Sequence, residues 1–274
     1  EWARATGETY LEYTLNRRRV PLGLRAGMAV ADKLVFSKLR ARTGGRIRLM
    51  VSGGAPLNPE ICRFFIAAGL VIYEGYGLTE TSPVITVNSA AMLKPGTVGR
   101  PIPGVEVKIA DDGEILTRGP HVMQGYYNNP QATAEAIDAE GWFHTGDIGL
   151  IDSDGCLKIT DRKKDLIVTA GGKNIAPQPI EGLLKTNKFF TNAVMLGDKR
   201  KFPIMLLVPN FPVLEGWLTV KGMPKLPPDT LVTVTEVQEK RAREARKSLR
   251  DLAQFETPKK FLILPRDFTI EGGE

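Results

Sequence analysis

The stretch GYGLTETSP, residues 75–83, places oxygen-bearing side chains at successive positions directly after an apolar run. Tyr76 offers a flat face for a purine ring, Thr79 a hydroxyl for a phosphate, and Glu80 a hard oxygen for Mg²⁺. These groups could serve one nucleotide. The competing interpretation is a strand-to-helix turn in which the glycines supply positive φ and Thr79 acts as a cap, which is the commoner meaning of a lone Gly-x-Gly.

A second glycine-containing stretch, SGGAPLNPE, begins at residue 52. Its glycines could let backbone N–H groups approach an anion ahead of a helix N-terminus. The stretch lacks the Gly-Lys-Ser/Thr ending that a Walker loop requires, so it is a weak candidate for a triphosphate site. A close backbone approach to a flat or slender ligand suits these glycines better.

In HTGDIG, residues 144–149, Asp147 follows a glycine and precedes a strand-like segment. An ionised aspartate only accepts hydrogen bonds, and its two oxygens could take both hydroxyls of a ribose. A turn-capping aspartate is the simpler alternative for the motif by itself. His144 has no evident partner for a catalytic triad, and we expect no catalytic role for it.

The segment DRKKDLIVTAGGKN, residues 161–174, puts three adjacent cations at an apparent change of domain. A solvated run of charges is the usual explanation. The alternative is that Arg162 binds a ribose or phosphate, because a guanidinium suits paired contacts with oxygens. Lys164 would then stand where the backbone could act as a hinge.

The elements that must hold these residues begin with a βαβ unit over residues 46–76. RIRLMVS predicts a buried strand, NPEICRFFIAAG a helix and LVIYEGY a second strand. Asn58 suits the helix N-cap, Pro59 the first helical position, and Gly69 the C-terminal stop. A strand, a crossover helix and a strand imply a parallel sheet, with ligands beyond the carboxyl ends of the strands. SGGAP and GYGLTETSP would then face one crevice.

Short alternating runs between residues 97 and 160 predict a small antiparallel barrel or sheet, interrupted by a helix over PQATAEAI. After residue 164 a strand, a Gly-Gly turn, a helix and two further strands predict a small α+β domain. The charge-dense stretch from about residue 234 to 255 predicts a helix with a solvated face rather than a nucleic-acid site. The fold class is therefore α/β followed by α+β.

The chain has 274 residues, a net charge of +6, two cysteines and 42% hydrophobic residues. This composition is that of a soluble globular protein of up to two domains, and no apolar run is long enough to span a bilayer. We expect a cytoplasmic protein with two reduced thiols. The positive charge favours an anionic partner, which could be a nucleic acid, a membrane surface or a phosphorylated small molecule.

The order and spacing of SGGAP, GYGLTETSP, GWFHTGDIG and DRKKDLIVTAGGKNIAP resemble those of the adenylate-forming enzymes. This superfamily includes acyl-CoA synthetases, luciferases and peptide-synthetase adenylation domains. The stretch DRKKDLIVTAGGKNIAPQPIE most resembles that of an AMP-forming long-chain fatty-acid–CoA ligase of bacterial type. The resemblance implies that a fatty-acid carboxylate attacks the α-phosphate of Mg-ATP, giving acyl-AMP and pyrophosphate. A CoA thiol then displaces AMP.

The resemblance implies a role for each matching residue of the GYGLTE segment. Tyr76 would stack on adenine, and Gly77 would belong to the same nucleotide-binding turn. Thr79 would hold the α-phosphate and Glu80 would bind Mg²⁺, which makes both of them catalytic residues. The segment would thus be the adenylate site.

Matching residues elsewhere would complete the site. Gly53, Gly54 and Ala55 would border the adenine and acyl pocket. Asp147 and Arg162 would hold the ribose.

The remaining matches concern the second half-reaction. Lys164 would be a catalytic hinge, and Gly171 and Gly172 would line the thiol channel after the small domain rotates. The implied domains are residues 1–161, the C-terminal portion of the large AMP-binding domain, and residues 162–274, a small domain truncated at its end. ATP or AMP, Mg²⁺, CoA and a fatty acid would be the ligands, with no nucleic acid and with peripheral association with a membrane as a further expectation.

Two parts of the family pattern have no match. The family carries a Ser/Thr/Gly-rich loop ending in a lysine, which holds the β- and γ-phosphates. It also carries a C-terminal lysine shortly after a segment like FTIEGGE, residues 268–274. We therefore expect a C-terminal fragment that is inactive by itself, with an exposed apolar sheet edge.

Two alternatives remain open at this point. A fatty acyl-AMP ligase or a peptide-synthetase adenylation domain would pass the acyl group to a carrier protein instead of CoA. A nucleotide- or anion-binding module would carry out no chemistry.

Overall fold

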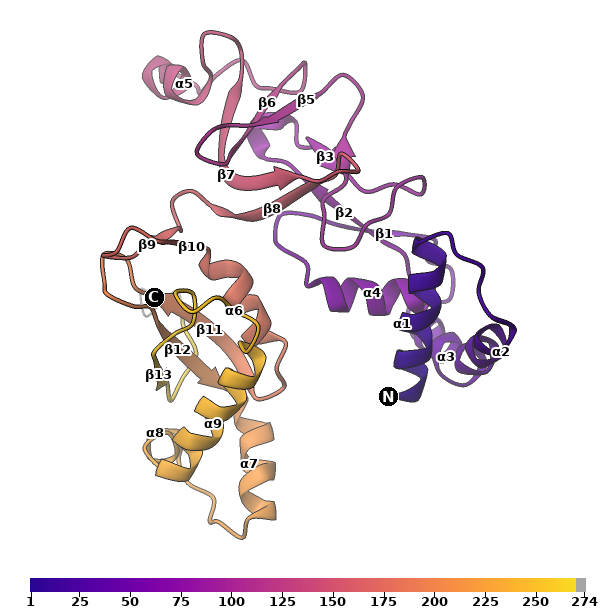
Figure 1. Cartoon of the computed structure of the whole chain (residues 1–274), viewed down its shortest axis with the longest axis vertical. Helices are drawn as coiled ribbons and strands as arrows, with labels where there is room; N and C mark the ends of the chain where they lie inside the picture. The colour runs from indigo at the N-terminus through magenta and orange to yellow at the C-terminus, as the bar shows by residue number, and fades with distance from the viewer. Residues whose placement is uncertain (270–274) are drawn as a thin grey trace. The chain divides into compact units, whose positions relative to one another are not determined.

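The computed structural model describes residues 1–269 and divides the chain into two compact units, the first Glu1–Ile159 and the second beginning at Thr160 (Figure 1). The sequence predicts this boundary between residues 161 and 162. Residues 270–274, which hold most of the FTIEGGE segment, lie outside the described residues. Within the described part of the chain, no helix has the length and apolar character needed to cross a membrane.

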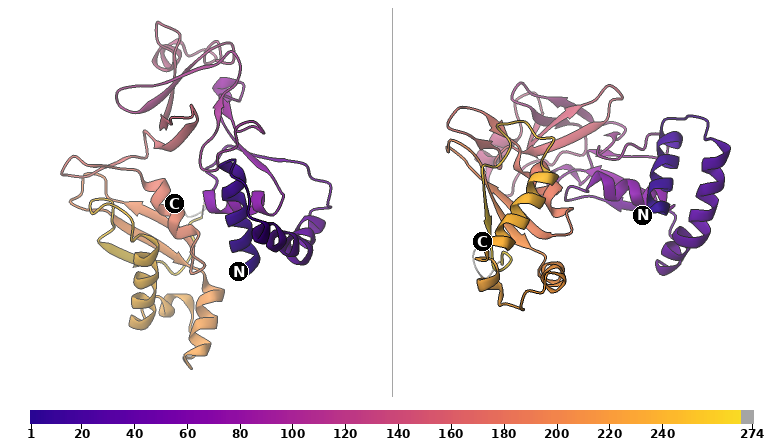
Figure 2. Two further views of the ribbon diagram at one scale, coloured as in Figure 1. Left: turned by 45° about the vertical axis from the view of Figure 1, so that its right-hand side comes forward. Right: turned by 60° about the horizontal axis from the view of Figure 1, so that its bottom comes forward.

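The first unit opens with three helices, α1 Trp2–Leu15, α2 Leu22–Ala31 and α3 Ser37–Arg42, with a π-helical segment between the last two. Helix α1 contacts both α2 and the later helix α4, Pro59–Ala67 (Figures 1 and 2). Ala3, Ala31, Phe36 and Ala68 form the buried cluster between these helices. The helices therefore form a small core of their own at the start of the chain.

The predicted βαβ unit is confirmed. Strand β1, Met50–Ser52, runs parallel to β2, Ile72–Tyr76, and α4 connects them. The Asn58 side chain accepts hydrogen bonds from the N–H groups of Glu60 and Ile61 at 2.8 and 3.2 Å. Gly69 has φ +80° just beyond the helix. Local capping chemistry therefore sets both ends of α4.

Two expectations about this sheet were wrong. The sheet has the order β1-β2-β3-β4, and β3, Thr86–Val87, pairs antiparallel with both β2 and β4, Arg100–Pro101. The sheet is mixed because the chain turns back directly after β2 and makes no second crossover. The predicted buried strand over residues 46–52 is confined to β1, whose Val51 side chain is 68% exposed. Val51 points to the opposite face of the sheet from its half-buried neighbours Met50 and Ser52.

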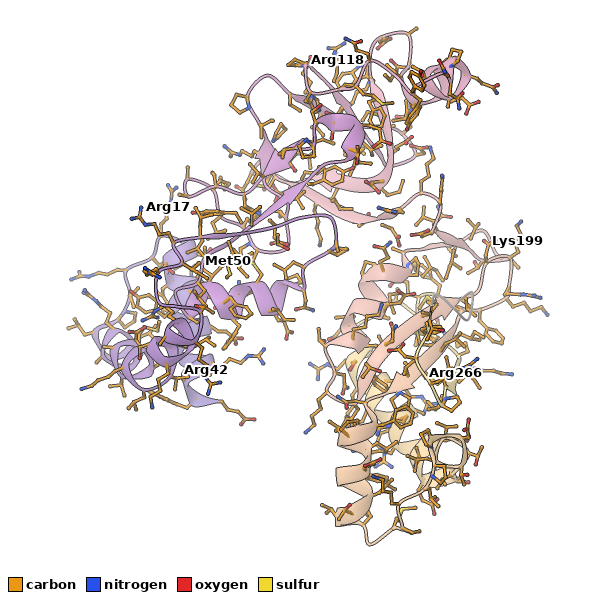
Figure 3. All side chains as sticks on the ribbon, turned by 180° about the vertical axis from the view of Figure 1, so that it is seen from behind. Arg17, Arg42, Met50, Arg118, Lys199 and Arg266 are labelled. Atoms are coloured by element: carbon orange, nitrogen blue, oxygen red, sulfur yellow. The ribbon has the colours of Figure 1, made fainter. Side chains whose placement is uncertain are left out.

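The alternating runs form a second, antiparallel sheet in the order β5-β6-β7-β8. The predicted helix is α5, Pro130–Ala136. Strand β6 ends at Arg118, which is labelled in Figure 3. Tyr76 of the first sheet packs against Ile115 and Leu157 of the second in one buried cluster. The strands are β5 Glu106–Ile109, β6 Glu114–Arg118, β7 Phe143–Ile151 and β8 Leu157–Arg162.

The second unit has the predicted α+β order. A hairpin of two short strands precedes a helix and a three-stranded sheet in the order β11-β12-β13, in which β11 and β12 are antiparallel and β12 and β13 parallel. Ile175, Leu184, Met205 and Leu207 are among its fully buried core residues. The elements are β9 Ile167–Val168, β10 Asn174–Ile175, α6 Pro177–Lys185, β11 Phe190–Leu196, β12 Ile204–Pro209, α7 Phe211–Val220, α8 Pro228–Leu231, α9 Thr235–Ser248 and β13 Lys260–Ile263.

Helix α9 is the predicted charge-dense helix, but one of its cations is fully buried. Arg241 has no exposed surface, and its Nε and Nη2 atoms form no hydrogen bond within the described chain. Its Nη1 donates to the carbonyl oxygen of Phe189 at 3.2 Å, and the guanidinium lies 4.8 Å from the centre of the Phe189 ring. Burial lowers the pKa of Arg241 to about 10. The charge pattern alone did not reveal this position.

We predict that Arg241→Met keeps or raises the stability of the chain. Removing a buried charge and two unsatisfied donors should offset the lost contacts with Phe189, so the free energy of unfolding should be unchanged or higher by about 1–2 kcal/mol. Urea unfolding measures the change, with Arg243→Met on the exposed face of α9 as the control. A loss of more than about 1 kcal/mol in Arg241→Met alone would show that the guanidinium stabilises the fold.

Candidate nucleotide site

The two glycine-containing stretches lie at the same edge of the first sheet. In the parallel pair of β1 and β2, Ser52 stands opposite Glu74, so the chain leaves both strands at their carboxyl ends side by side. A Cβ atom on Gly53 would lie 3.3 Å from the carbonyl oxygen of Gly75, which shows how closely the backbones approach. Gly54, with φ +80°, and Ala55 are exposed next to it. The structure therefore brings the two stretches together.

The hydroxyl of Tyr76 donates a hydrogen bond of 2.6 Å to Oδ2 of Asp147. The two residues are 71 positions apart and come from different sheets, β2 and β7. Their exposed fractions are only 8% and 7%. A hydrogen bond to an ionised carboxylate contributes about 1.5–3 kcal/mol and is stronger still where water is excluded. Two residues that the sequence assigns separately to adenine and ribose are thus one bonded pair.

Asp147 is aimed toward Tyr76 by an irregularity in the sheet. Between β6 and β7, Glu114 pairs with Ile148 and Leu116 pairs with His144, so β7 carries extra residues at this point. A β-bulge bends its strand and changes the direction of the side chains. Gly146, with φ +71°, supplies the required backbone conformation.

The buried carboxylate of Glu114 fixes this bulge. Its Oε1 accepts the N–H of Gly146 at 2.9 Å, and its Oε2 lies 3.1 Å from Nδ1 of His144. The hydroxyl of Thr145 donates to the carbonyl oxygen of Ile115 at 2.7 Å. His144 therefore belongs to the support of the Asp147 turn. Glu114 was not predicted, and its signal is an acidic residue directly before the apolar pair Ile115 and Leu116.

The turn after β2 is capped by Thr81 and not by Thr79. The N–H of Leu78 donates to the hydroxyl of Thr81 at 2.9 Å, and that hydroxyl donates to the carbonyl oxygen of Leu78 at 3.0 Å. Thr81 is fully buried, whereas Thr79 is exposed. The hydroxyl of Thr79 forms no hydrogen bond within residues 1–269. The capping explanation for Thr79 is therefore wrong, and its hydroxyl is available to a ligand.

Glu80 is held from two directions by the segment before α5. Its Oε1 accepts a hydrogen bond of 3.0 Å from the hydroxyl of Tyr126, and its carbonyl oxygen accepts the N–H of Met123 at 2.8 Å. Burial, together with the Glu80 carboxylate, raises the pKa of Tyr126. Sequence analysis missed Tyr126 because its contact with Glu80 is distant along the chain.

The residues fit a magnesium ion that arrives with its nucleotide. Among the described residues, no group of three or more His, Cys, Asp or Glu side chains could hold a metal. Mg²⁺ usually takes one or two protein carboxylates and completes its shell with phosphates and water. Glu80, half-buried beside the available hydroxyl of Thr79, meets that requirement.

Gly77 has a packing reason to be glycine. A Cβ atom there would overlap the carbonyl oxygen of Pro83, because the chain folds back closely over the turn. The close approach explains this glycine without a ligand. Its predicted contact with a nucleotide stays a prediction.

The other predicted residues lie at the start of the second unit. Arg162 ends β8, and Lys164 is exposed in the turn that follows, where the N–H of Asp165 donates to the carbonyl oxygen of Arg162 at 3.0 Å. The neighbouring Asp161 is buried, and burial raises its pKa to about 6. A single turn therefore joins a buried carboxyl to exposed cations.

Gly171 and Gly172 form the exposed tip of the hairpin between β9 and β10. A Cβ atom on either glycine would meet nothing within 4 Å, and Gly172 has φ +73°. The Thr169 hydroxyl accepts the N–H of Lys173 at 3.1 Å and closes the turn. Packing within the chain does not explain the first glycine.

A large groove, about 740 Å³ in volume, lies away from all of these residues. It is in the second unit, between α9 and β13, and none of the predicted site residues lines it. The predicted site residues therefore form no part of this groove.

Comparison with known proteins finds a matching family model in each unit. Residues 20–127 match the family described as AMP-binding enzyme, and residues 164–217 match the AMP-binding enzyme C-terminal domain. The long-chain-fatty-acid–CoA ligase FadD15 of Mycobacterium bovis is 46% identical over 259 residues, covering 92% of this chain and 42% of the relative. The peroxisomal long chain acyl-CoA synthetase 7 of Arabidopsis thaliana is 36% identical, covering 94% of this chain and 39% of the relative. The chain thus spans less than half the length of these curated relatives.

Solved structures agree with this assignment. The o-succinylbenzoate coenzyme A synthetase of Bacillus subtilis in complex with AMP is 27% identical, with a TM-score of 0.64, over 91% of this chain and 51% of that one. The carboxylic acid reductase A-PCP didomain of Segniliparus rugosus shares the fold, with a TM-score of 0.68 at 22% identity, over 99% of this chain and 36% of that one. On these matches, the chain belongs to the AMP-binding, adenylate-forming enzymes.

Proposed function

We propose that this chain is part of an enzyme that activates a long-chain fatty acid with ATP and transfers the acyl group to CoA. The observation that carries the proposal is the bonded pair of Tyr76 and Asp147 at the carboxyl ends of β1 and β2, beside the available hydroxyl of Thr79. The similarity to a long-chain-fatty-acid–CoA ligase and to a long chain acyl-CoA synthetase supports the fatty acid and CoA. The chain spans only 42% of the length of the first relative. The proposal therefore concerns the whole enzyme of which this chain would be a part.

In the proposed first step, the chain's own residues bind and orient the nucleotide. Tyr76, fixed through its hydroxyl, offers a ring face to adenine, and Asp147 accepts hydrogen bonds from the ribose. The hydroxyl of Thr79 donates to the α-phosphate. An oxygen of the fatty-acid carboxylate then forms a bond to the α-phosphorus while the bond to pyrophosphate breaks. Gly53, Gly54 and Ala55 border the pocket without side chains that would obstruct it.

Glu80 holds the magnesium ion in this proposal, and the ion, when bound, neutralises part of the charge on the phosphates. One carboxylate is sufficient because the nucleotide supplies other ligands. The exposed position of Thr79 next to Glu80 supports a role for its hydroxyl as a donor to the same phosphates.

In the proposed second step, the small domain takes a different orientation about Lys164. Residues 1–161 act as the C-terminal portion of the large domain and residues 162–274 as the small domain. Gly171 and Gly172 line the thiol channel, and Arg162 contacts the ribose. The thiol sulfur forms a bond to the acyl carbon, AMP leaves, and the thiol proton passes to solvent. A cytoplasmic location with contact at a membrane surface belongs to the same proposal, and the net charge of +6 supports the contact.

The test is exchange of radiolabelled pyrophosphate into ATP by the full-length enzyme, with and without a long-chain fatty acid. We expect exchange that depends on both the acid and Mg²⁺, followed by thioester formation with CoA. The 274-residue chain by itself should be slower by at least about 10²–10³, since phosphate-binding donors of the family pattern are missing from it. Transfer of the acyl group to a carrier protein and not to CoA would show that the acceptor is a carrier protein. Absence of pyrophosphate exchange by the full-length enzyme would favour a nucleotide-binding module without catalytic activity.

We further predict that Lys164→Pro separates the two half-reactions. Proline fixes φ near about −65°, and a rotation of the small domain that needs another φ would cost about 3 kcal/mol, so thioester formation should fall about a hundredfold while acyl-AMP formation changes little. Rapid-quench measurement of each half-reaction gives the comparison. Lys163→Pro is the control, because it lies one position earlier in the same turn, where proline is tolerated. Equal losses in both half-reactions would remove the hinge role.

A further inference from the structure

The contact between Tyr126 and Glu80 joins two segments that are 46 residues apart. The hydroxyl of Tyr126 donates to Oε1 of Glu80 at 3.0 Å, and Met123 of the same segment donates its N–H to the Glu80 carbonyl oxygen at 2.8 Å. The segment thus bonds both the main chain and the side chain of Glu80. Two bonds to one residue fix it more firmly than either bond could alone.

Tyr126 is itself held in place by α5. Its N–H donates to the hydroxyl of Thr133 at 2.9 Å, and that hydroxyl donates to the carbonyl oxygen of Asn129, also at 2.9 Å. Gly125 has φ +151°, and a Cβ atom there would lie 2.8 Å from the Thr133 methyl group. Asn129 caps the helix by accepting the N–H of Ala132 at 3.0 Å. The helix that interrupts the second sheet therefore serves as the support for one tyrosine.

We propose that Tyr126 is a positioning residue for the magnesium ligand Glu80. This inference rests on the proposed function. The hydroxyl holds one carboxylate oxygen and leaves the other to the metal that arrives with the nucleotide. Tyr126 contacts neither the nucleotide nor the reacting atoms in this account.

The physical reason is the ordering of a half-exposed carboxylate. A glutamate side chain has several rotatable bonds, and fixing it when the metal binds costs conformational entropy. A hydrogen bond formed beforehand removes part of that cost. Loss of an outer partner of a metal ligand typically weakens metal affinity or activity by about 10–100-fold.

The chain offers a matched control at the next position. Tyr127 is 93% exposed, and its hydroxyl forms no hydrogen bond within the described residues. Tyr126→Phe and Tyr127→Phe make the same chemical change, the loss of one phenolic hydroxyl. Only the first breaks the contact with Glu80.

The experiment measures binding of a non-hydrolysable ATP analogue to the full-length enzyme by calorimetry, in Mg²⁺ and in a chelator. For Tyr126→Phe we expect affinity in Mg²⁺ to fall about tenfold, with affinity in the chelator unchanged. Tyr127→Phe should match the wild type in both buffers. Higher Mg²⁺ should restore the initial rate of acyl-AMP formation by Tyr126→Phe. Restoration of this kind is not expected from a variant that is merely less stable.

Three results would overturn the inference. Equal weakening in both buffers would assign Tyr126 a purely structural role. Unchanged binding would remove the positioning effect, and tighter binding in Mg²⁺ would show that the hydroxyl competes with the metal. If the wild type itself gains nothing from Mg²⁺, the proposed role of Glu80 fails and this inference fails with it. If the wild type binds more tightly in Mg²⁺ and only the expected effect of Tyr126→Phe is absent, this inference alone fails.

Thr133→Val provides a second variant that leaves Glu80 and both tyrosines intact. It removes the acceptor of the Tyr126 N–H while conserving side-chain shape. We expect a smaller loss that is again confined to Mg²⁺. If Tyr126→Phe does not fold, a Thr133→Val enzyme with wild-type binding in Mg²⁺ would contradict the inference.

Discussion

The hydrogen bond between Tyr76 and Asp147 is the interaction on which the proposed nucleotide site depends. The two residues belong to different sheets, and these sheets pack together at the buried cluster around Tyr76. A carboxylate that is only 7% exposed needs a strong donor, and the tyrosine hydroxyl at 2.6 Å is one. The bond therefore stabilises the packing of the sheets and at the same time sets the orientation of the ring.

Other residues of the site follow from the need to keep this pair in place. The bulge in β7 turns Asp147 inward, and the carboxylate of Glu114 holds the bulge through the N–H of Gly146. On the other side of the pair, the hydroxyl of Thr81 closes the turn after β2 and leaves Thr79 exposed. Glu114 and Thr81 are buried and support the two turns, whereas Thr79 is exposed.

Local features of this fold could be predicted from the sequence, and contacts between distant segments could not. Asn58 and Gly69 set the two ends of α4 through interactions within a few residues, so both helix ends could be predicted from the sequence. The hydrogen bond between Tyr126 and Glu80 depends on how two sheets pack, and neither residue type predicts it. The burial of Arg241 was not predicted for a related reason, because a charged helix gives no sign of which face will be covered.

The most direct test of this account is a double-mutant cycle on AMP binding by the full-length enzyme, using Tyr76→Phe, Asp147→Ala and the pair. Asp147→Ala should weaken AMP about ten- to a hundredfold, because the ribose loses charged acceptors and the ring loses its anchor. Tyr76→Phe keeps the flat face and loses only the hydrogen bond, so its effect should be smaller. The account predicts that the double variant binds AMP about as well as Asp147→Ala alone, since both changes break the same bond. Losses that simply multiply would contradict it.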